Sequence, residues 1–133
     1  VGQANVSAIV GGGTTFTVSA QRQPYRSSVP NNNFYVFEQM GGRVERRFPL
    51  GSTIGGGLSF SQNAYAQAAS PLPGAPEILR RDRTVRLEGY ANLAIVDHFG
   101  FRVSILRNRR YSNFPGADYN TIVVFGGFVL GWN

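Results

Sequence analysis

The chain has 133 residues, enough for one domain, and its formal charge is +6 because 13 arginines outnumber seven acidic residues. It has no cysteine, which excludes disulfide scaffolds, thiol catalysis and cysteine-ligated metals, and no apolar run near eighteen residues, which excludes a transmembrane helix. Seventeen glycines, seven prolines and 13% aromatic residues indicate one all-β unit over residues 1–133, whose strands need only about nine to eleven residues to cross a membrane.

The first predicted strand covers residues 4–21, where apolar and polar side chains alternate. The alternation continues through Gly11 to Gly13, which favours one long strand. The alternative is a short hairpin that turns at these three glycines. Long strands favour a membrane protein, whereas short ones favour a compact soluble sandwich.

The second and third strands follow a loop over 22–33 that contains two prolines and three consecutive asparagines. The second strand is predicted over 33–48. A tight turn at 48–52 leads into the third strand, over 53–67, where polar and apolar residues again alternate.

The fourth strand, over 83–96, has the clearest pattern, with an apolar face opposite a polar one. Before it, residues 67–82 hold three prolines and no period, so they are predicted to form the longest loop. The remaining predicted elements are a short turn (97–100), a fifth strand (101–111), a medium loop (112–118) and a sixth strand (119–133).

The connections therefore alternate between long and short along the chain. Outer-membrane barrels with up-and-down strands have this arrangement, with long loops outside the cell and short turns in the periplasm. Strands of roughly twelve to sixteen residues also exceed the soluble mode of about five to six. The pattern favours an antiparallel up-and-down transmembrane β-barrel, or the C-terminal strands of one, over a soluble antiparallel β-barrel or sandwich.

Aromatic residues gather near the predicted strand ends, where the interfacial girdles of a membrane barrel lie. Each of them singly is also compatible with an ordinary core ring. They are Phe34, Tyr35, Phe48, Tyr65, Phe99, Phe101, Tyr111, Tyr119 and Trp132.

The last 50 or so residues carry a series of short motifs in a fixed order. The series comprises Arg81-Asp82, Arg110 to Asn113, Asp118-Tyr119 and Trp132. This segment resembles the closing strands of outer-membrane β-barrel, porin-like proteins associated with exopolysaccharide operons. The resemblance implies a membrane-embedded barrel in the bacterial outer membrane, connected with passage of polysaccharide or another solute.

Six predicted strands are fewer than the eight or so with which closed single-chain barrels begin. The chain is therefore expected to belong to a larger barrel, to contribute strands to a homo-oligomer, or to contain shorter strands. An even number of strands would place both ends of the series on the periplasmic side.

Charged residues in the strands are the best functional candidates. Residues on polar strand faces can line a lumen and favour anionic solutes, or pair across strands and merely fill the interior. These lumen candidates are Arg43, Glu45, Arg47, Arg86, Glu88 and Arg102.

A second group lies near the expected outer ends of the fourth and fifth strands. It can meet lipid headgroups or lipopolysaccharide phosphates, or form a solvated rim. These rim candidates are Arg80, Arg81, Arg83, Arg107, Arg109 and Arg110.

The sequence offers little for catalysis. His98 beside Asp97 has no serine or cysteine partner in its motif, and one histidine without a carboxylate cluster is poor evidence for a metal. The GGG stretches lack a lysine and open no helix, so they form no phosphate loop. Nucleic-acid binding is disfavoured because the basic residues of the stretch 101–111 lie toward the ends of that strand, while its middle is apolar. We expect no enzyme, cofactor or metal; the alternative function is a soluble binding or assembly module.

Overall fold

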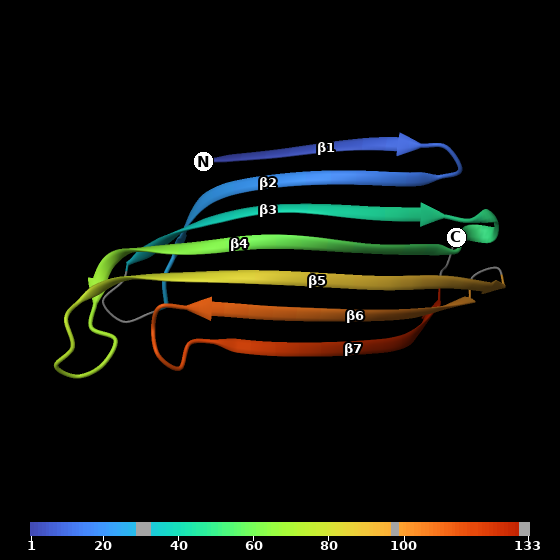
Figure 1. The fold of residues 1–133 in the computed structure, drawn as a ribbon. Helices are drawn as coiled ribbons and strands as arrows, with labels where there is room; N and C mark the ends of the chain where they lie inside the picture. Colours follow the sequence, from blue (N-terminus) through green and yellow to red (C-terminus); the bar gives the residue numbers. More distant parts are fainter. Residues whose placement is uncertain (29–32, 97–98, 131–133) are drawn as a thin grey trace.

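The computed structural model describes residues 1–28, 33–96 and 99–130, which form a single antiparallel sheet (Figure 1). Each strand pairs with the next one along the chain, in the order β1-β2-β3-β4-β5-β6-β7. A 3₁₀ turn, η1, covers Pro49–Gly51. The strands are β1 (Gly2–Val10), β2 (Thr14–Arg26), β3 (Phe34–Arg47), β4 (Thr53–Ala69), β5 (Ile78–Val96), β6 (Phe99–Ser112) and β7 (Tyr119–Leu130).

The predicted all-β, antiparallel, up-and-down architecture is confirmed, but the prediction of six strands is wrong. The first predicted strand is two strands, β1 and β2, which turn at Gly11 to Gly13. Gly12 and Gly13 have φ values of +75° and +78°, which glycine adopts at little cost. Val10 pairs with Thr14, so each strand keeps its own alternation and the interruption was invisible in the pattern.

The predicted loops at 22–33 and 67–82 are too long because strands extend into both. β2 continues through Pro24 to Arg26, although its pairing with β1 ends at Arg22. Pro24 is tolerated there because no strand pairs with β2 on the β1 side at that position. β4 and β5 continue pairing as far as Ala69 and Ile78, past a bulge in β4 between Ala64 and Ala68. Such a bulge breaks the period of two, so the sequence pattern ends before the strand does.

The connections are sorted by length between the two ends of the sheet. The β1–β2 and β3–β4 connections, at 11–13 and 48–52, lie at what we call the short-turn end, on the right of Figure 1. The connections at 70–77 and 113–118 lie at the opposite, long-loop end. Because seven is odd, β1 begins at the long-loop end and β7 finishes at the short-turn end, so the expectation that both lie on one side is wrong.

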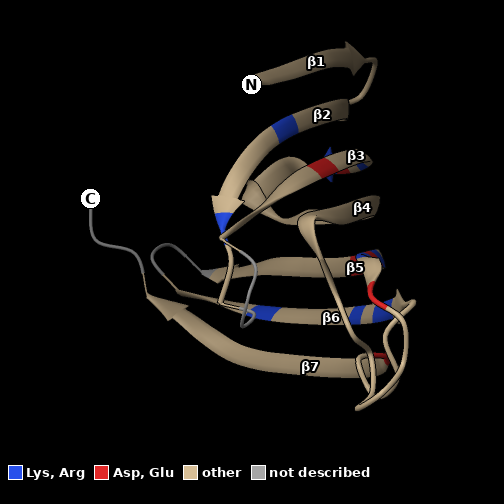
Figure 2. Cartoon of the chain, turned by 90° about the vertical axis from the view of Figure 1, so that its left-hand side faces the viewer, with Lys and Arg blue, Asp and Glu red and all other residues tan. Residues whose placement is uncertain are grey.

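The sheet is curved, and charged residues lie on β2, β3, β5 and β6 (Figure 2). It is not closed, because β1 and β7 each pair on one side only. Among the described residues there is no second sheet to make a sandwich, and only Tyr65 and Asp82 are buried. No helix within the described ranges is long and apolar enough to cross a membrane. The sheet therefore exposes both of its faces.

Candidate functional site

Strand register divides the side chains between two faces of opposite character. The polar face carries the charged residues of the strand centres, such as Arg43 and Glu88, while the apolar face carries their neighbours, such as Val44 and Leu87. All six lumen candidates share the polar face: Arg43, Glu45, Arg47, Arg86, Glu88 and Arg102. The sequence assigned these residues to the polar faces of separate strands. The register shows that those faces form one side of the sheet.

Tyr90 of β5 lies at the centre of these residues. Its hydroxyl donates a hydrogen bond to the Glu45 carboxylate and accepts one from Arg43 Nε at 3.2 Å. The guanidinium carbons of Arg43 and Arg102 lie 4.7 and 6.0 Å from the centre of the Tyr90 ring. Arg43 also approaches Glu45 at 3.8 Å. One tyrosine therefore links side chains from β3, β5 and β6, and sequence reasoning missed it because it selected charged residues only.

The contact between Tyr90 and Glu45 spans an intervening strand, β4. It exists because β4 carries Gly55 between them in the register, and a Cβ there would overlap the Tyr90 ring. Gly57 similarly faces the Glu88 side chain, whose Oε1 would lie 3.3 Å from an added Cβ. The glycines of β4 thus provide the space in which side chains from β5 lie across the sheet.

A hollow of about 530 Å³ adjoins this cluster on the polar face. Arg86 and Glu88, which approach each other at 3.4 Å, contribute to its lining together with Arg43. Hydroxyl and amide side chains of β1, β2 and β4 supply much of the rest. The hollow can therefore hold water or a polar solute beside arginines, rather than an apolar ligand.

A second polar network lies toward the long-loop end and centres on Asp82, which is 1% exposed. Its carboxylate accepts hydrogen bonds from Arg80 Nε at 3.1 Å, from Arg110 and from Ser112 Oγ at 2.5 Å. The Arg80 guanidinium also lies over the ring of Tyr65, 5.0 Å from its centre. Two arginines share one buried carboxylate, so the network keeps one surplus positive charge.

Backbone contacts join this network to the loop between β6 and β7. Asn113 accepts a hydrogen bond from the Arg81 backbone N–H at 2.8 Å, and Asp118 accepts one from the Ser112 backbone N–H at 2.6 Å. Asp82, Ser112, Asn113 and Asp118 are among the residues that carry the resemblance noted above. Their contacts supply a local structural reason for the motif: they anchor the loop to β5.

An aromatic row continues the Asp82 network across β4, β3 and β2. The ring of Tyr65 lies 5.3 Å from that of Tyr35, which in turn lies 5.8 Å from Tyr25. Phe37 contacts Tyr25 edge-on at 5.8 Å. Of the aromatics expected to form interfacial girdles, Tyr35 and Tyr65 therefore lie on the polar face, and so does Tyr119, beneath Arg110.

Other aromatics of that set lie on the apolar face, near both ends of the strands. Phe99 and Phe101 lie at the short-turn end and contact Phe128, with ring centres 5.4 and 5.5 Å apart. Phe34 and Tyr111 lie at the long-loop end. Phe48 lies just beyond β3 under the guanidinium of Arg46, 5.3 Å away. Trp132 lies outside the described residues.

The rim candidates divide between the two faces. Arg80 and Arg110 are engaged by Asp82 on the polar face. Arg83, Arg107 and Arg109 lie on the apolar face, in register with Tyr111, Leu87 and Val85 respectively. Arg81 belongs to the apolar face by alternation with Arg83. The sequence grouped these arginines by position along the chain, whereas alternation places neighbours on opposite sides.

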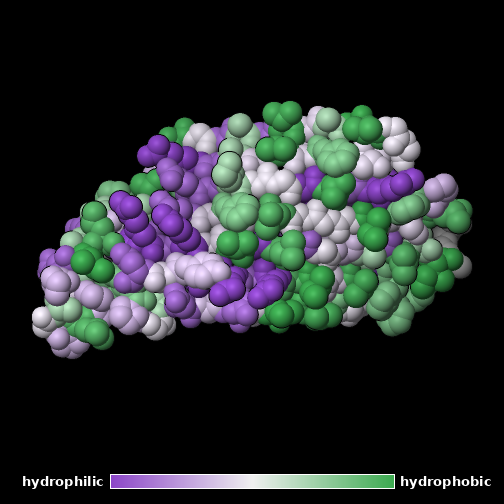
Figure 3. All heavy atoms as spheres, in the orientation of Figure 1, coloured by the Kyte–Doolittle hydropathy of each residue, from purple (hydrophilic) through white to green (hydrophobic). Residues whose placement is uncertain are grey.

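The apolar face is exposed along a band whose position shifts from strand to strand. On β2 the centre of the band lies at Val18. In the register row of Val18, the residue on β6 is the charged Arg107. The apolar positions of β6 instead lie within 99–105, closer to the short-turn end. In Figure 3, hydrophilic side chains gather toward the long-loop end and hydrophobic ones over the short-turn halves of β5 to β7. The band therefore crosses the sheet obliquely.

The polar face has an excess of positive charge. Among the described strands it carries six arginines against three carboxylates, an excess of three. The arginines are Arg43, Arg47, Arg80, Arg86, Arg102 and Arg110, and the carboxylates are Glu45, Asp82 and Glu88. This arrangement attracts anions.

No group of three or more metal-binding side chains occurs within the described part of the chain. Asp97 and His98, which were weighed as a catalytic pair, lie outside it. No protein-family model matches this chain, and the searches of curated proteins and of solved structures likewise give no match. The resemblance to outer-membrane porin-like proteins therefore stays a prediction.

Proposed function

We propose that the chain is a membrane-spanning part of a β-barrel whose apolar face contacts lipid and whose polar face lines an aqueous interior. The oblique apolar band carries this proposal. Between β2 and β6 the centre of the band moves by five residues along the strand direction, about 17 Å at ~3.3 Å per residue. Across the sheet, β2 and β6 are four strand spacings apart, about 19 Å. The corresponding angle is about 40°, which is the tilt of strands in transmembrane barrels.

The height of the band agrees with the same interpretation. On β5 the apolar face is apolar from Val85 to Ile95, eleven residues or about 36 Å along the strand. Tilted by about 40°, this length spans roughly 28 Å, close to the ~25 Å apolar band of outer-membrane barrels. Strands of 14 to 19 residues, such as β5 and β6, are long enough for such a crossing.

The polar face supports a pore, or an anchor with a filled interior, in which anions are favoured over cations. The hollow is lined by Arg43, Arg86 and Glu88, a surplus of one positive charge, and the polar face as a whole carries a surplus of three. Rings of arginine give anion preference in channels because they lower the energy of a passing negative charge. The location we propose is the bacterial outer membrane, with long loops outside. The resemblance implies polysaccharide or another solute, and the positive charge of the polar face favours an anionic one.

An all-antiparallel closed barrel needs strands beyond the seven described. β1 and β7 run in the same direction, so they cannot pair with each other in an antiparallel ladder. A second copy or further strands of a larger barrel would cover these edges, which otherwise present unpaired backbone groups.

These same edges favour one alternative: a soluble module whose exposed apolar face and edges are covered by a protein partner. The two proposals differ in what covers Val18 and Leu87, which are 63% and 54% exposed in the isolated chain. Lipid would cover them in the first case, and protein in the second. Only the first requires detergent for a monodisperse product.

The test is purification with and without detergent, followed by conductance in planar lipid bilayers. We expect β-rich protein that stays monodisperse only in detergent, with anion-selective conductance. Arg43→Gln/Arg102→Gln should reduce the anion preference, because it removes two charges from the polar face. Arg26→Gln/Arg46→Gln removes the same charge from the other face and should leave the preference unchanged. A β-rich monomer in plain buffer would contradict the membrane proposal; insertion without conductance would contradict the pore and retain the anchor.

A further inference from the structure

Three arginines on the apolar face lie close together beside apolar side chains. Arg83 of β5 pairs in register with Tyr111 of β6, so Arg109 is its diagonal neighbour, about 7–8 Å away at the backbone. Arg107 lies two residues further along β6, about 7 Å from Arg109. Arg109 therefore lies between the other two, and long side chains bridge the separation from Arg83 to Arg109, so these two guanidinium groups can meet one ligand.

None of these arginines has a carboxylate partner among the described residues. Arg83 Nε donates to Gln62 Oε1 at 3.2 Å, and Arg107 Nε donates to Asn120 Oδ1 at 3.3 Å. The Arg109 guanidinium lies over the ring of Tyr111, 4.8 Å from its centre. The amide oxygens orient the guanidinium groups but leave their charges uncompensated. Four of the six arginines of the polar face, in contrast, are paired with Asp82, Glu45 or Glu88.

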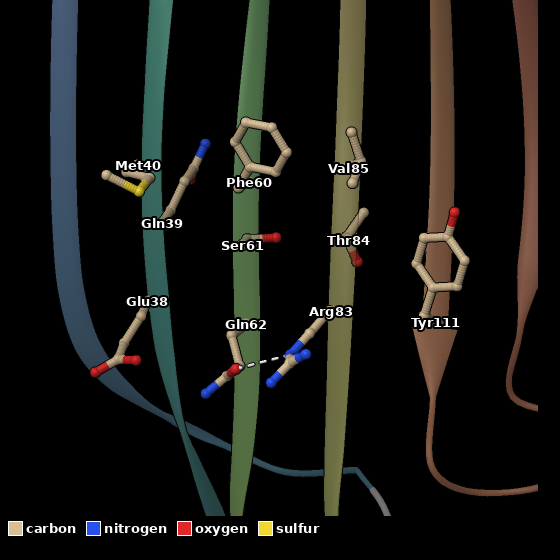
Figure 4. Close-up of a pocket in the computed structure, with 10 residues that line it drawn as sticks. All are labelled: Glu38, Gln39, Met40, Phe60, Ser61, Gln62, Arg83, Thr84, Val85 and Tyr111. Atoms are coloured by element: carbon tan, nitrogen blue, oxygen red, sulfur yellow. Dashed lines mark hydrogen bonds between the residues drawn. The ribbon is translucent and has the colours of Figure 1, made fainter.

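Two adjoining grooves run along the apolar face beside this cluster. The larger, about 480 Å³, lies across β3 to β6 and includes Met40, Phe60 and Val85 in one row (Figure 4). The smaller, about 270 Å³, includes Leu58 and Leu87. Val85 and Tyr111 line both. The cluster of three arginines and the two apolar grooves therefore form one continuous surface.

The larger groove becomes polar toward the long-loop end. Glu38, Gln62 and Arg83 form the row beyond Met40, Phe60 and Val85, and a hydrogen bond joins Gln62 to Arg83 (Figure 4). The carboxylate of Glu38 is paired with Arg22 at 3.2 Å, which offsets its repulsion of an anion. A ligand that fits must therefore be apolar over one part and negatively charged at one end.

We propose that this surface binds one phosphate-bearing acylated lipid. Its phosphate lies beside Arg83 and Arg109, with Arg107 next to Arg109, and its acyl chains lie in the grooves beside Phe60 and Val85. Charge complementarity selects this occupant: guanidinium groups form strong, directed hydrogen bonds to phosphate oxygens, and the lipid boundary of the band falls at these residues. The inference rests on the proposed membrane-spanning function and adds to it a specific lipid.

The experiment compares lipids bound to the intact 133-residue chain in detergent micelles, by native mass spectrometry. The probe is phosphatidic acid, and diacylglycerol with the same acyl chains is the uncharged comparison. Insertion is checked first, from the β-rich circular dichroism spectrum and the need for detergent. We expect one phosphatidic acid retained per chain, with about tenfold preference over diacylglycerol.

The variants locate the site. Arg83→Gln/Arg109→Gln should reduce the preference at least fivefold. Arg26→Gln/Arg46→Gln removes two charges from the same face, away from the grooves, and should keep the preference. Inorganic phosphate at millimolar concentration should not displace the lipid, because it cannot fill the grooves.

Each other outcome overturns the proposal in an identifiable way. Equal retention of diacylglycerol means that the arginines contribute nothing. Displacement by inorganic phosphate means a simple anion site, and an equal loss in both double variants means non-specific attraction. These results leave the barrel proposal intact if the protein still needs detergent. A chain that is monodisperse in plain buffer removes both proposals together.

Discussion

Replacing Gly55 with alanine tests whether Tyr90 really crosses β4 to reach β3. An alanine Cβ would occupy the space of the Tyr90 ring, so the ring must move away from Glu45 and Arg43. The hydrogen bond to the carboxylate contributes roughly 2 kcal/mol and the cation–π contact about 0.5 kcal/mol at a partly exposed site. We therefore expect Gly55→Ala to lower the free energy of unfolding by about 2–3 kcal/mol.

The measurement is urea unfolding in lipid vesicles, followed by circular dichroism. Gly89→Ala is the matched control, because a Cβ there meets only the Ile105 side chain at an ordinary 3.5 Å. Alanine at such a position should be neutral or slightly stabilising, since glycine weakens a strand.

A double-mutant cycle with Tyr90→Ala isolates the cause. If the cost of Gly55→Ala arises from displacing Tyr90, it should fall below about 0.5 kcal/mol once Tyr90 has been removed. An unchanged cost in that background would show that Gly55 is needed for a backbone reason and not for the tyrosine.

Two other substitutions test separate parts of the sheet. Asp82→Asn leaves Arg80 and Arg110 without their shared carboxylate and should lower the free energy of unfolding by about 3 kcal/mol. Glu77→Gln, in the neighbouring loop, is the control and should leave the free energy of unfolding unchanged. Equal effects of the two substitutions in urea unfolding would contradict the buried network. Leu50 is 91% exposed and has a φ of +69°, a left-handed conformation that asparagine adopts more readily than leucine. Leu50→Asn should therefore raise the free energy of unfolding by about 1 kcal/mol. A lower free energy of unfolding would show that the leucine side chain makes a stabilising contact.

Alternation in the sequence was sufficient to predict the faces of the strands. In β5 it separated Val85 and Leu87 from Arg86 and Glu88, as the register confirms. Alternation failed to predict the strand boundaries at a tight turn, which preserves the period of two, and at a bulge, which breaks it. The turn at Gly11 to Gly13 preserves the alternation, so two strands looked like one, and the bulge in β4 breaks it, so two strands looked shorter than they are.

The candidate site was predictable only as far as single strands determine it. The charges of Arg43, Glu45 and Arg102 could be selected from their own strands. Their meeting at Tyr90 could not, because it depends on which residues of β3, β5 and β6 share a register row and on the glycine between them. Asp82 was named only as part of a motif, and its network could not be predicted for the same reason: its partners Arg110 and Ser112 lie 28 and 30 residues away, on β6.

Reagent accessibility along β5 distinguishes an apolar face that contacts lipid from one that is buried against protein. The chain has no cysteine, so single cysteines at Leu87, Ala91, Thr84 and Asn92 can each carry a nitroxide spin label without further changes. In lipid vesicles, we expect labels at Leu87 and Ala91 to be accessible to oxygen, which concentrates in the bilayer, and labels at Thr84 and Asn92 to be accessible to a water-soluble nickel complex. Labels at Leu87 and Ala91 that are immobile and reached by neither reagent would contradict contact with lipid, because those residues would then be buried against protein.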